Sequence, residues 1–95
     1  MAAPIFSMKG YVYIIHSEKS GRYYIGSTNN LERRLKQHDA GSVVATRNKG
    51  PWKRVAWVEF ATPMLAKKAE CHLKRQKSRR AVEMVISGSF TWPDF

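Results

Sequence analysis

The segment from residue 11 to residue 38 constrains the fold most, because it predicts two strands and a helix in close succession. Residues 11–16 form a run of β-branched and aromatic residues, which is typical of a strand. A polar turn leads to a second strand over residues 22–26, so the two strands are expected to pair as an antiparallel hairpin. The first run lacks a clean apolar–polar alternation, which indicates that both faces of its sheet are covered.

A helix is expected to follow the hairpin, from residue 31 to about residue 40. Asn29 is the predicted N-cap, since Glu32 three residues later completes a pattern that resembles a capping box. Gly41 suits the position just beyond the helix C-terminus.

Two pairs of side chains on this helix lie one turn apart. Leu31 and Leu35 are expected to face the core. Arg34 and His38 lie beside that leucine stripe rather than opposite to it, so Arg34 should place its guanidinium at the edge of the packed interface.

The later elements are predicted from their caps. A third strand is expected over residues 54–61, and Thr62 with Pro63 marks the start of a second helix. Ser78 and Gly88 bound a third helix. The chain is therefore predicted to be an α+β domain, in which a three-stranded antiparallel sheet is flanked by about three helices.

Glu70 is the one acid of the predicted second helix. Leu65, Ala69 and Leu73 form the buried stripe of that helix, and Glu70 lies at the border of the stripe. A carboxylate in that position loses hydration unless it gains a partner. Two kinds of partner fit, a neighbouring lysine or a metal ion.

The length of 95 residues supports a single domain with one modest core. Residues 1–9 show no periodicity and are expected to be a loose N-terminal segment, followed by the domain over residues 10–88. Residues 89–95 form an aromatic tail, which is expected to pack on its own domain rather than on a partner.

The net charge of +10, from 17 lysines and arginines against 7 acids, suggests a polyanionic partner, with nucleic acid first. Five basic residues lie among the seven of residues 74–80, and Lys74, Arg75 and Lys77 are expected to bind the phosphate backbone. The alternative is a solvated connector between two helices. An anionic membrane fits less well, because no long amphipathic basic stretch stands apart from the core pattern.

Cys71 is the single cysteine, which excludes a disulfide within the chain and argues against a cysteine-based zinc site. The first residues lack the basic and apolar regions of a secretory signal. No apolar run approaches the ~20 residues of a membrane span. These features predict a soluble protein of a reducing compartment, the cytoplasm.

Two short tyrosine motifs precede the first predicted helix. Residues 11–13 read Tyr-Val-Tyr and residues 24–26 read Tyr-Ile-Gly, and the helix that follows carries an arginine. In this combination they resemble the GIY-YIG nuclease family. Three further features fall in the order that the family predicts: Thr46, Pro51-Trp52 and Glu70.

The chain departs from the family pattern in the first motif. Tyr11 stands where the family name has glycine, and Val12 stands for isoleucine. Both residues suit a strand, so the expected fold is unchanged. Tyr11 is nevertheless expected to alter how closely a substrate approaches Tyr13.

The resemblance implies metal-dependent hydrolysis of a DNA phosphodiester. By similarity, Tyr13 and Tyr24 are the motif phenols, Arg34 binds the phosphate, and Glu70 holds Mg²⁺ or Mn²⁺. Gly26 would let the backbone pass close to the site. These residue types suit the reaction, which needs a nucleophilic water, a group that takes its proton, and charge stabilisation on the phosphate.

The residues leave several roles open. A phenol has a reference pKa near ~10, and a neighbouring metal ion and guanidinium would favour its phenolate, so Tyr13 is a workable general base. Which tyrosine takes the proton is not decided by the sequence. His38 fits a catalytic or phosphate-binding role, a helix C-terminal cation, or a packed residue at the edge of the helix.

The main functional prediction is a divalent-metal-dependent DNA endonuclease, structure-specific in repair or recombination and acting on branched or damaged DNA. A domain alone lacks further DNA-binding regions, so a protein partner is expected to supply specificity. One alternative is a nucleic-acid-binding module that cuts weakly or not at all. Another is a protein–protein adaptor that uses the aromatic tail.

Overall fold

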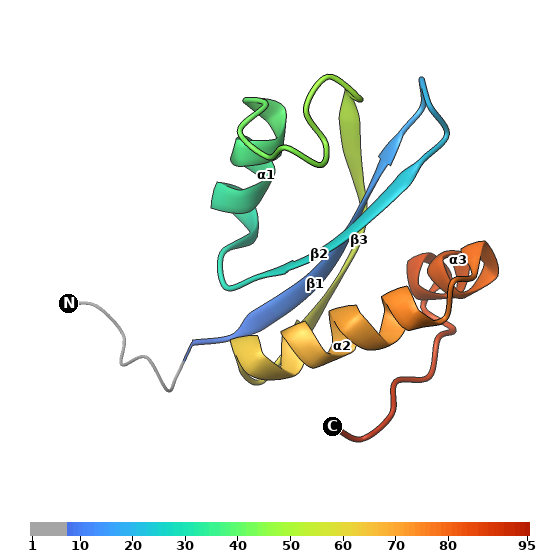
Figure 1. The fold of residues 1–95 in the computed structure, drawn as a ribbon. Helices are drawn as coiled ribbons and strands as arrows, with labels where there is room; N and C mark the ends of the chain where they lie inside the picture. Colours follow the sequence, from blue (N-terminus) through green and yellow to red (C-terminus); the bar gives the residue numbers. More distant parts are fainter. Residues whose placement is uncertain (1–7) are drawn as a thin grey trace.

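Strand β1 (Gly10–Ser17) is the central strand of a three-stranded antiparallel sheet (Figure 1). The computed structural model describes residues 8–95, so the loose segment predicted for residues 1–9 lies outside the described residues except for its last two positions. The strand order is β2-β1-β3, with β2 spanning Tyr23–Thr28 and β3 spanning Trp52–Phe60. Every β1 residue from position 12 to position 15 is at most 1% exposed, which confirms that both faces of this strand are covered.

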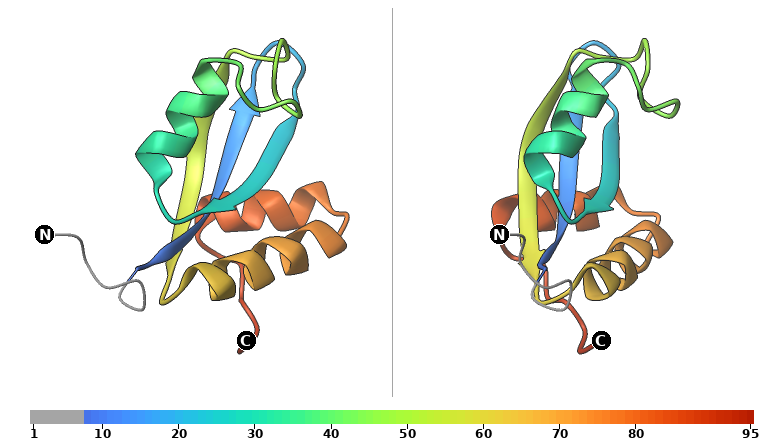
Figure 2. Two further views of the ribbon diagram at one scale, coloured as in Figure 1. Left: turned by 60° about the vertical axis from the view of Figure 1, so that its left-hand side comes forward. Right: turned by 90° about the vertical axis from the view of Figure 1, so that its left-hand side faces the viewer.

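The helices cover the two faces unequally (Figure 2). Helix α1 (Leu31–Asp39) lies on one face of the sheet, and helices α2 (Pro63–Arg75) and α3 (Arg79–Ser87) lie on the other (Figures 1 and 2). This arrangement confirms the predicted α+β class, with its three-stranded sheet and three helices. Within residues 8–95, none of the helices combines the length and the apolar character that crossing a bilayer requires.

The apolar core lies between the sheet and the α2–α3 pair. Ile14 of β1 packs into one cluster with Leu73 of α2 and with apolar residues of α3. Val12, two positions earlier on the same face of β1, packs with Ala66 and Ala69 of α2. The alternation of β1 therefore directs its even-numbered residues to this core and its odd-numbered residues to the α1 face.

The caps of α2 and α3 are those that the sequence predicts. The Thr62 hydroxyl accepts a hydrogen bond from the Leu65 N–H, and Pro63 occupies the first helical position. Ser78 caps α3 in the same way, and Gly88 ends it in the left-handed conformation, with φ 81°.

The cap predicted for α1 is wrong by one residue. Asn30, not Asn29, is the N-cap, because its backbone is extended and its side-chain oxygen accepts a hydrogen bond from the Arg33 N–H at 3.0 Å. The Asn29 side chain accepts instead from the Arg33 guanidinium at 3.1 Å. Since the helix starts at Leu31, the spacing from Asn29 to Glu32 that suggested a capping box does not describe it.

The apolar face predicted for α1 is weaker than expected. Leu31 and Leu35 are only half-buried, and the one buried residue of this helix is His38. Beneath the helix, β1 presents the phenol of Tyr13, which contacts His38, and the buried Ile15 lies on the same face. Helix α1 therefore docks partly through polar contacts, which form the centre of the candidate site.

The aromatic tail packs on its own domain, as expected. Phe90 and Trp92 join the partly buried residues around the core, and their ring centroids lie 4.7 Å apart. Trp92 also meets Phe60 of β3 edge to face, at 5.5 Å. Phe95 remains 42% exposed beyond them. The adaptor alternative therefore loses most of its proposed surface.

Candidate active site

Tyr13 is the centre of the polar cluster beneath α1. Its phenol oxygen lies 2.7 Å from His38 Nε2, and the Arg34 Nε–H donates a hydrogen bond to the same oxygen at 3.3 Å. The side chain of Tyr13 is 0% exposed, so this phenol is shielded from solvent. Arg34 and His38 reach it together because they lie one turn apart on α1.

Gly26 makes room for this phenol. It lies opposite Tyr13 in the pairing of β1 with β2 and is itself buried. A Cβ atom at position 26 would collide with the ring and hydroxyl of Tyr13. From the sequence, glycine was expected here because the backbone passes close to the site. In the structure, it is the Tyr13 ring that leaves no room for a side chain at position 26.

A chain of hydrogen bonds continues from Tyr13 through His38 into the loop between α1 and β3. His38 Nδ1 lies 2.7 Å from the Thr46 hydroxyl, and that hydroxyl is 3.4 Å from the Val43 carbonyl. The Trp52 indole N–H donates to the Thr46 carbonyl at 2.9 Å, which fixes the loop from its other end. One consistent assignment has each hydroxyl or ring N–H donate to the next group, from Tyr13 to His38, from His38 to Thr46, and from Thr46 to Val43.

Burial decides the protonation of the Tyr13–His38 pair. It raises the pKa of Tyr13 to about 12, against the hydrogen bond from Arg34, which lowers it. Burial also lowers the pKa of His38, and the neighbouring charge of Arg34 lowers it further. His38 is therefore a neutral, packed residue. Of the three roles that the sequence left open for His38, that of a helix C-terminal cation is not supported. The Tyr13 hydrogen bond raises the pKa of Arg34, so the guanidinium stays charged.

Tyr24 is the more accessible of the two motif phenols. It lies on the edge strand β2 and is half-buried, and its ring meets that of His38 edge to face at 5.1 Å. The Tyr13 and Tyr24 ring centroids are 6.3 Å apart. Lys74 of α2 places its ammonium 5.9 Å from the Tyr24 ring, within cation–π range. Tyr24 therefore links the α1 cluster to the charged groups of α2.

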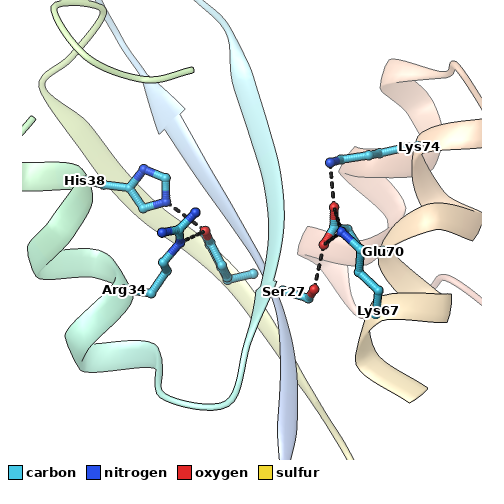
Figure 3. Close-up of polar contacts among 7 residues, drawn as sticks. Ser27, Arg34, His38, Lys67, Glu70 and Lys74 are labelled. Atoms are coloured by element: carbon cyan, nitrogen blue, oxygen red, sulfur yellow. Dashed lines mark hydrogen bonds and ion pairs between the residues drawn. The ribbon is translucent and has the colours of Figure 1, made fainter. Parts of the chain in front are cut away.

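Glu70 lies across β2 from the Tyr13 cluster (Figure 3). Glu70 is only 4% exposed, and its carboxylate accepts a hydrogen bond from the Ser27 hydroxyl at 2.6 Å. Lys74 Nζ approaches its other carboxylate oxygen to 2.5 Å, and Lys67 Nζ lies 3.4 Å from the carboxylate. Burial alone would raise the pKa of Glu70, but the bonds from Lys74 and Ser27 and the two ammonium charges outweigh it and lower the pKa. The lysine partner that the sequence allowed is thus present.

The donor set at Glu70 fits one kind of metal site. Among residues 8–95, no group of three or more His, Cys, Asp and Glu side chains is placed to hold an ion, which argues against zinc. Mg²⁺ commonly keeps several waters and accepts one or two protein carboxylates, and Mn²⁺ also prefers oxygen ligands. Glu70 offers one such carboxylate, already ionised and already facing positive charge.

Only one of the three basic residues predicted to bind the phosphate backbone belongs to either group. Lys74 contacts Glu70, whereas Arg75 and Lys77 are exposed at the junction of α2 and α3. Sequence reasoning placed Thr46 and Trp52 in the family's order but assigned neither a role in holding His38. Ser27, the partner of Glu70, was missed, although it immediately follows the second tyrosine motif.

The family of this chain follows from a sequence comparison with known domains. A model of the GIY-YIG catalytic domain matches residues 9–83, which span the sheet, both clusters and most of α3. The chain belongs to the GIY-YIG family. It therefore carries a GIY-YIG nuclease domain, and the resemblance seen in the two tyrosine motifs is confirmed.

Several small proteins are similar to this GIY-YIG chain over most of their length. UPF0213 protein BH0048 of Halalkalibacterium halodurans is 37% identical over 81 residues, which cover 84% of each chain. UPF0213 protein CPE1444 of Clostridium perfringens is 35% identical over 80 residues, 83% of this chain and 85% of the relative. The solution NMR structure of BH0048 superimposes with a TM-score of 0.53 at 36% identity, covering 84% of both chains, and confirms the fold.

A second kind of relative is much longer. A protein of Giardia intestinalis, described as a structure-specific endonuclease subunit SLX1 homolog, is 45% identical over 58 residues. The match covers 57% of this chain and 16% of that protein. The GIY-YIG unit therefore occurs both in proteins of about this size and within larger ones.

Proposed function

We propose that this GIY-YIG domain is an endonuclease that hydrolyses DNA phosphodiester bonds with the help of Mg²⁺ or Mn²⁺. One observation carries the proposal: a charged guanidinium, an accessible phenol and an ionised, buried carboxylate meet at the edge strand β2. Arg34 lies on one side of this strand and Glu70 on the other (Figure 3), and Tyr24 of β2 contacts His38 on the Arg34 side. Each supplies a function that phosphodiester hydrolysis requires.

Arg34 is the proposed phosphate ligand. Its Nε and Nη1 groups donate to Tyr13 and to Gln37, at 3.3 and 3.0 Å, which fixes the orientation of the guanidinium. Neither of these two bonds uses Nη2, and Tyr24 also interacts with the guanidinium and helps to raise its pKa, so the proposed phosphate contact is on the side of Arg34 that faces Tyr24. A preorganised donor of this kind stabilises charge that develops in the transition state without first having to reorient.

The two phenols take different roles in this proposal. Tyr24 is assigned to the attacking water, because it is half-buried whereas Tyr13 is fully buried. Tyr13 positions Arg34 from beneath, since burial and its raised pKa of about 12 keep it protonated and away from solvent. The sequence left open which phenol takes the proton, and accessibility favours Tyr24.

Glu70 is the proposed ligand of the divalent ion, with Ser27 orienting the carboxylate and water completing the ligand shell. A bound Mg²⁺ or Mn²⁺ would neutralise charge on the phosphate and on the leaving oxygen. Lys67 and Lys74 maintain the ionised state of Glu70 until the ion binds, and Lys74 can then turn to a phosphate of the same substrate.

The proposed substrate is DNA with a branch or a break in pairing, as processed in repair or recombination. The net charge of +10 supports a nucleic acid, with Arg75 and Lys77 as backbone contacts and a partner protein adding specificity. The Giardia relative is described as a structure-specific endonuclease subunit homolog, which supports the choice of branched forms.

A cleavage assay tests the proposal. The parent protein is incubated with blunt, nicked, flapped, branched and single-stranded DNA, each with Mg²⁺, with Mn²⁺ or with a chelator. Cleavage of at least one branched form, dependent on the ion, is expected. If no DNA form is cut with either ion, the enzyme proposal fails.

A binding module without cleavage is the second candidate, and one observation favours it. The carboxylate of Glu70 is already satisfied by Ser27, Lys67 and Lys74, which is how a structural ion pair would look. In that case DNA binding persists in chelator, and added Mg²⁺ neither tightens binding nor produces cleavage.

A further inference from the structure

Two aromatic side chains outside the catalytic cluster share the α1 face of the sheet. Trp57 of β3 is 54% exposed and pairs opposite Tyr13 of β1. Tyr11, which stands where the family motif has glycine, lies two positions before Tyr13 and therefore on the same face. The roles proposed for the hydrolysis of DNA use neither residue.

A bulge in β3 places a guanidinium on the Trp57 ring. Ile14 pairs with Ala56 and Ile15 pairs with Arg54, so Val55 is an extra residue in the strand. Without this bulge, residues 54 and 57 would point to opposite faces of the sheet, because they are three positions apart. With it, the Arg54 guanidinium lies 4.5 Å from the centre of the Trp57 ring, and more than half of the tryptophan still stays accessible.

A hollow lies between this pair and the start of α1. Its lining includes two aromatic residues, two carboxylates, one guanidinium and one amide: Tyr11, Trp57, Glu32, Glu59, Arg54 and Asn30. Aromatic rings stack on bases, and carboxylate and amide groups hydrogen-bond to base edges. Two carboxylates around one guanidinium make the hollow unsuited to a phosphate.

We infer that this hollow binds one unpaired base of the DNA whose backbone Arg34 holds, with the base stacked on Trp57. A base within a duplex has both faces covered by its neighbours, so only an unpaired or extruded base can use the platform. The hollow and Arg34 lie on different sides of α1, because Glu32 lines the hollow whereas Arg34 contacts the Tyr13 hydroxyl, which lies against Gly26 of β2. This inference rests on the proposed function and deepens it, because it explains how a small domain would recognise a flap or branch.

The test compares Trp57→Ala with the parent and with Phe95→Ala, a control that also removes an exposed aromatic. Binding is measured by fluorescence anisotropy in chelator, at one salt concentration, with a blunt duplex, the same duplex with a single-stranded flap, and that flap made of abasic sites. Trp57→Ala should bind the base-containing flap about tenfold more weakly, as expected for the loss of one base stack. Its affinity for the blunt duplex should stay within about twofold of the parent's, and Phe95→Ala should match the parent throughout.

The abasic flap makes the assignment to a base specific. The parent should bind it about tenfold more weakly than the normal flap, and Trp57→Ala should bind both flaps alike. Trp57→Phe, which keeps a ring face, should recover part of the affinity. Equal weakening of Trp57→Ala on blunt and flapped DNA would overturn the inference, as would parent binding that ignores the abasic change. A parent that self-associates in sedimentation, with Trp57→Ala monomeric, would also overturn it, because the face would then belong to a second copy.

These outcomes separate the two proposals. Flap binding that depends on Trp57 without cleavage in Mg²⁺ would leave the base platform standing and remove the nuclease proposal. Cleavage of flapped DNA, with flap binding unchanged in Trp57→Ala, would do the reverse.

Discussion

The groups around Tyr13 and the groups around Glu70 face each other across β2, yet they are held in place by different interactions. The Tyr13 side is buried and depends on contacts between distant parts of the chain, since Tyr13 and His38 are 25 positions apart. The Glu70 side is ionic and mostly local, because Lys67 and Lys74 are its neighbours within a turn of the same helix.

This difference assigns different capacities to the two sides. Hydrogen bonds in a dry environment fix geometry, so the Tyr13 side can hold Arg34 in one orientation. On the Glu70 side the carboxylate is buried but both lysines are largely exposed, so an ammonium group can move into solvent. If the proposed function is correct, the Tyr13 side would hold the phosphate ligand and the Glu70 side would exchange a lysine for a metal ion.

Glu70→Gln should impair the Glu70 side, and we expect the largest loss of cleavage rate from this substitution. We expect the cleavage rate to fall by at least about 10³-fold, since the ion would lose its one protein carboxylate. DNA binding should be unchanged or slightly tighter, because one negative charge is removed. Glu83→Gln, which alters an exposed acid of α3, is the matched control for cleavage kinetics and binding. A Glu70→Gln protein that cuts as fast as the parent would refute the assignment of Glu70 as metal ligand.

Arg34→Ala should impair the Tyr13 side, because it removes the proposed phosphate ligand. The expected loss is at least ~10² in cleavage rate, as for one preorganised donor, with a much smaller loss of affinity. Single-turnover kinetics separates the two quantities. Arg33→Ala is the control, because Arg33 lies one position away but points outward to Asn29. Equal losses in both variants would mean that α1 contributes bulk charge only.

Thr46→Val tests whether the loop fixes His38. Valine has nearly the shape of threonine but leaves the buried His38 Nδ1 without its partner, so unfolding should become easier by about 1–3 kcal/mol. Denaturant titration measures this change, and Ser42→Ala in the same loop, at an exposed position, is the control. A difference of less than about 0.5 kcal/mol would place Thr46 among ordinary surface substitutions.

The basic residues at the junction after α2 should strengthen DNA binding through their charge, without determining where the DNA is cut. Because Lys74 is bound to Glu70, the clean variant is Arg75→Ala combined with Lys77→Ala. The parent is expected to show a log–log salt slope of about −3 to −5 on duplex DNA, and the double variant a slope smaller by up to about 2. The position of cleavage should not move. An unchanged slope would identify these residues as a solvated connector.

The smallest effect expected is a pH dependence of stability from His38. Its pKa is lowered in the folded state, so below the unfolded value near ~6.5 the unfolded chain binds more protons than the native one. Stability is therefore fully present above about pH 6.5 and declines as the pH falls toward the folded pKa. Thermal melts from about pH 7.5 to 5.5 should show this decline in the parent and less of it in His38→Gln. If the melting temperatures of the parent and of His38→Gln fall in parallel with pH, His38 is not the source of the pH dependence.

The sequence predicted what depends on neighbouring residues. The hairpin, the caps at Thr62 and Ser78 and the border position of Glu70 were all correct, because each follows from spacing along one or two elements. The α1 cap was wrong by one residue, since Asn29 and Asn30 are both suitable and only the helix start decides between them.

What the sequence could not supply are the consequences of long-range packing. Complete burial of Tyr13 and the hydrogen bond from His38 to Thr46 require α1 and the following loop to be docked on the sheet. The bulge at Val55 likewise has no local signature, although it decides that Arg54 and Trp57 share a face. The proposal that Tyr24 rather than Tyr13 takes the proton depends on such packing, since accessibility is a property of the assembled domain.

The loop between α1 and β3 has a consequence for how the domain tolerates change. Surface loops ordinarily accept inserted residues and proteolytic nicks. This one is tied to three elements, because Thr46 bonds to His38 and Trp52, and the Ser17 hydroxyl donates to the Lys49 carbonyl at 2.8 Å. An insertion here, or a tryptic cut after the exposed Arg47, would detach the support of His38 while leaving the hydrophobic core intact. Among circular permutants and fusions of this domain, new termini in this loop should therefore give folded proteins with a disordered active site.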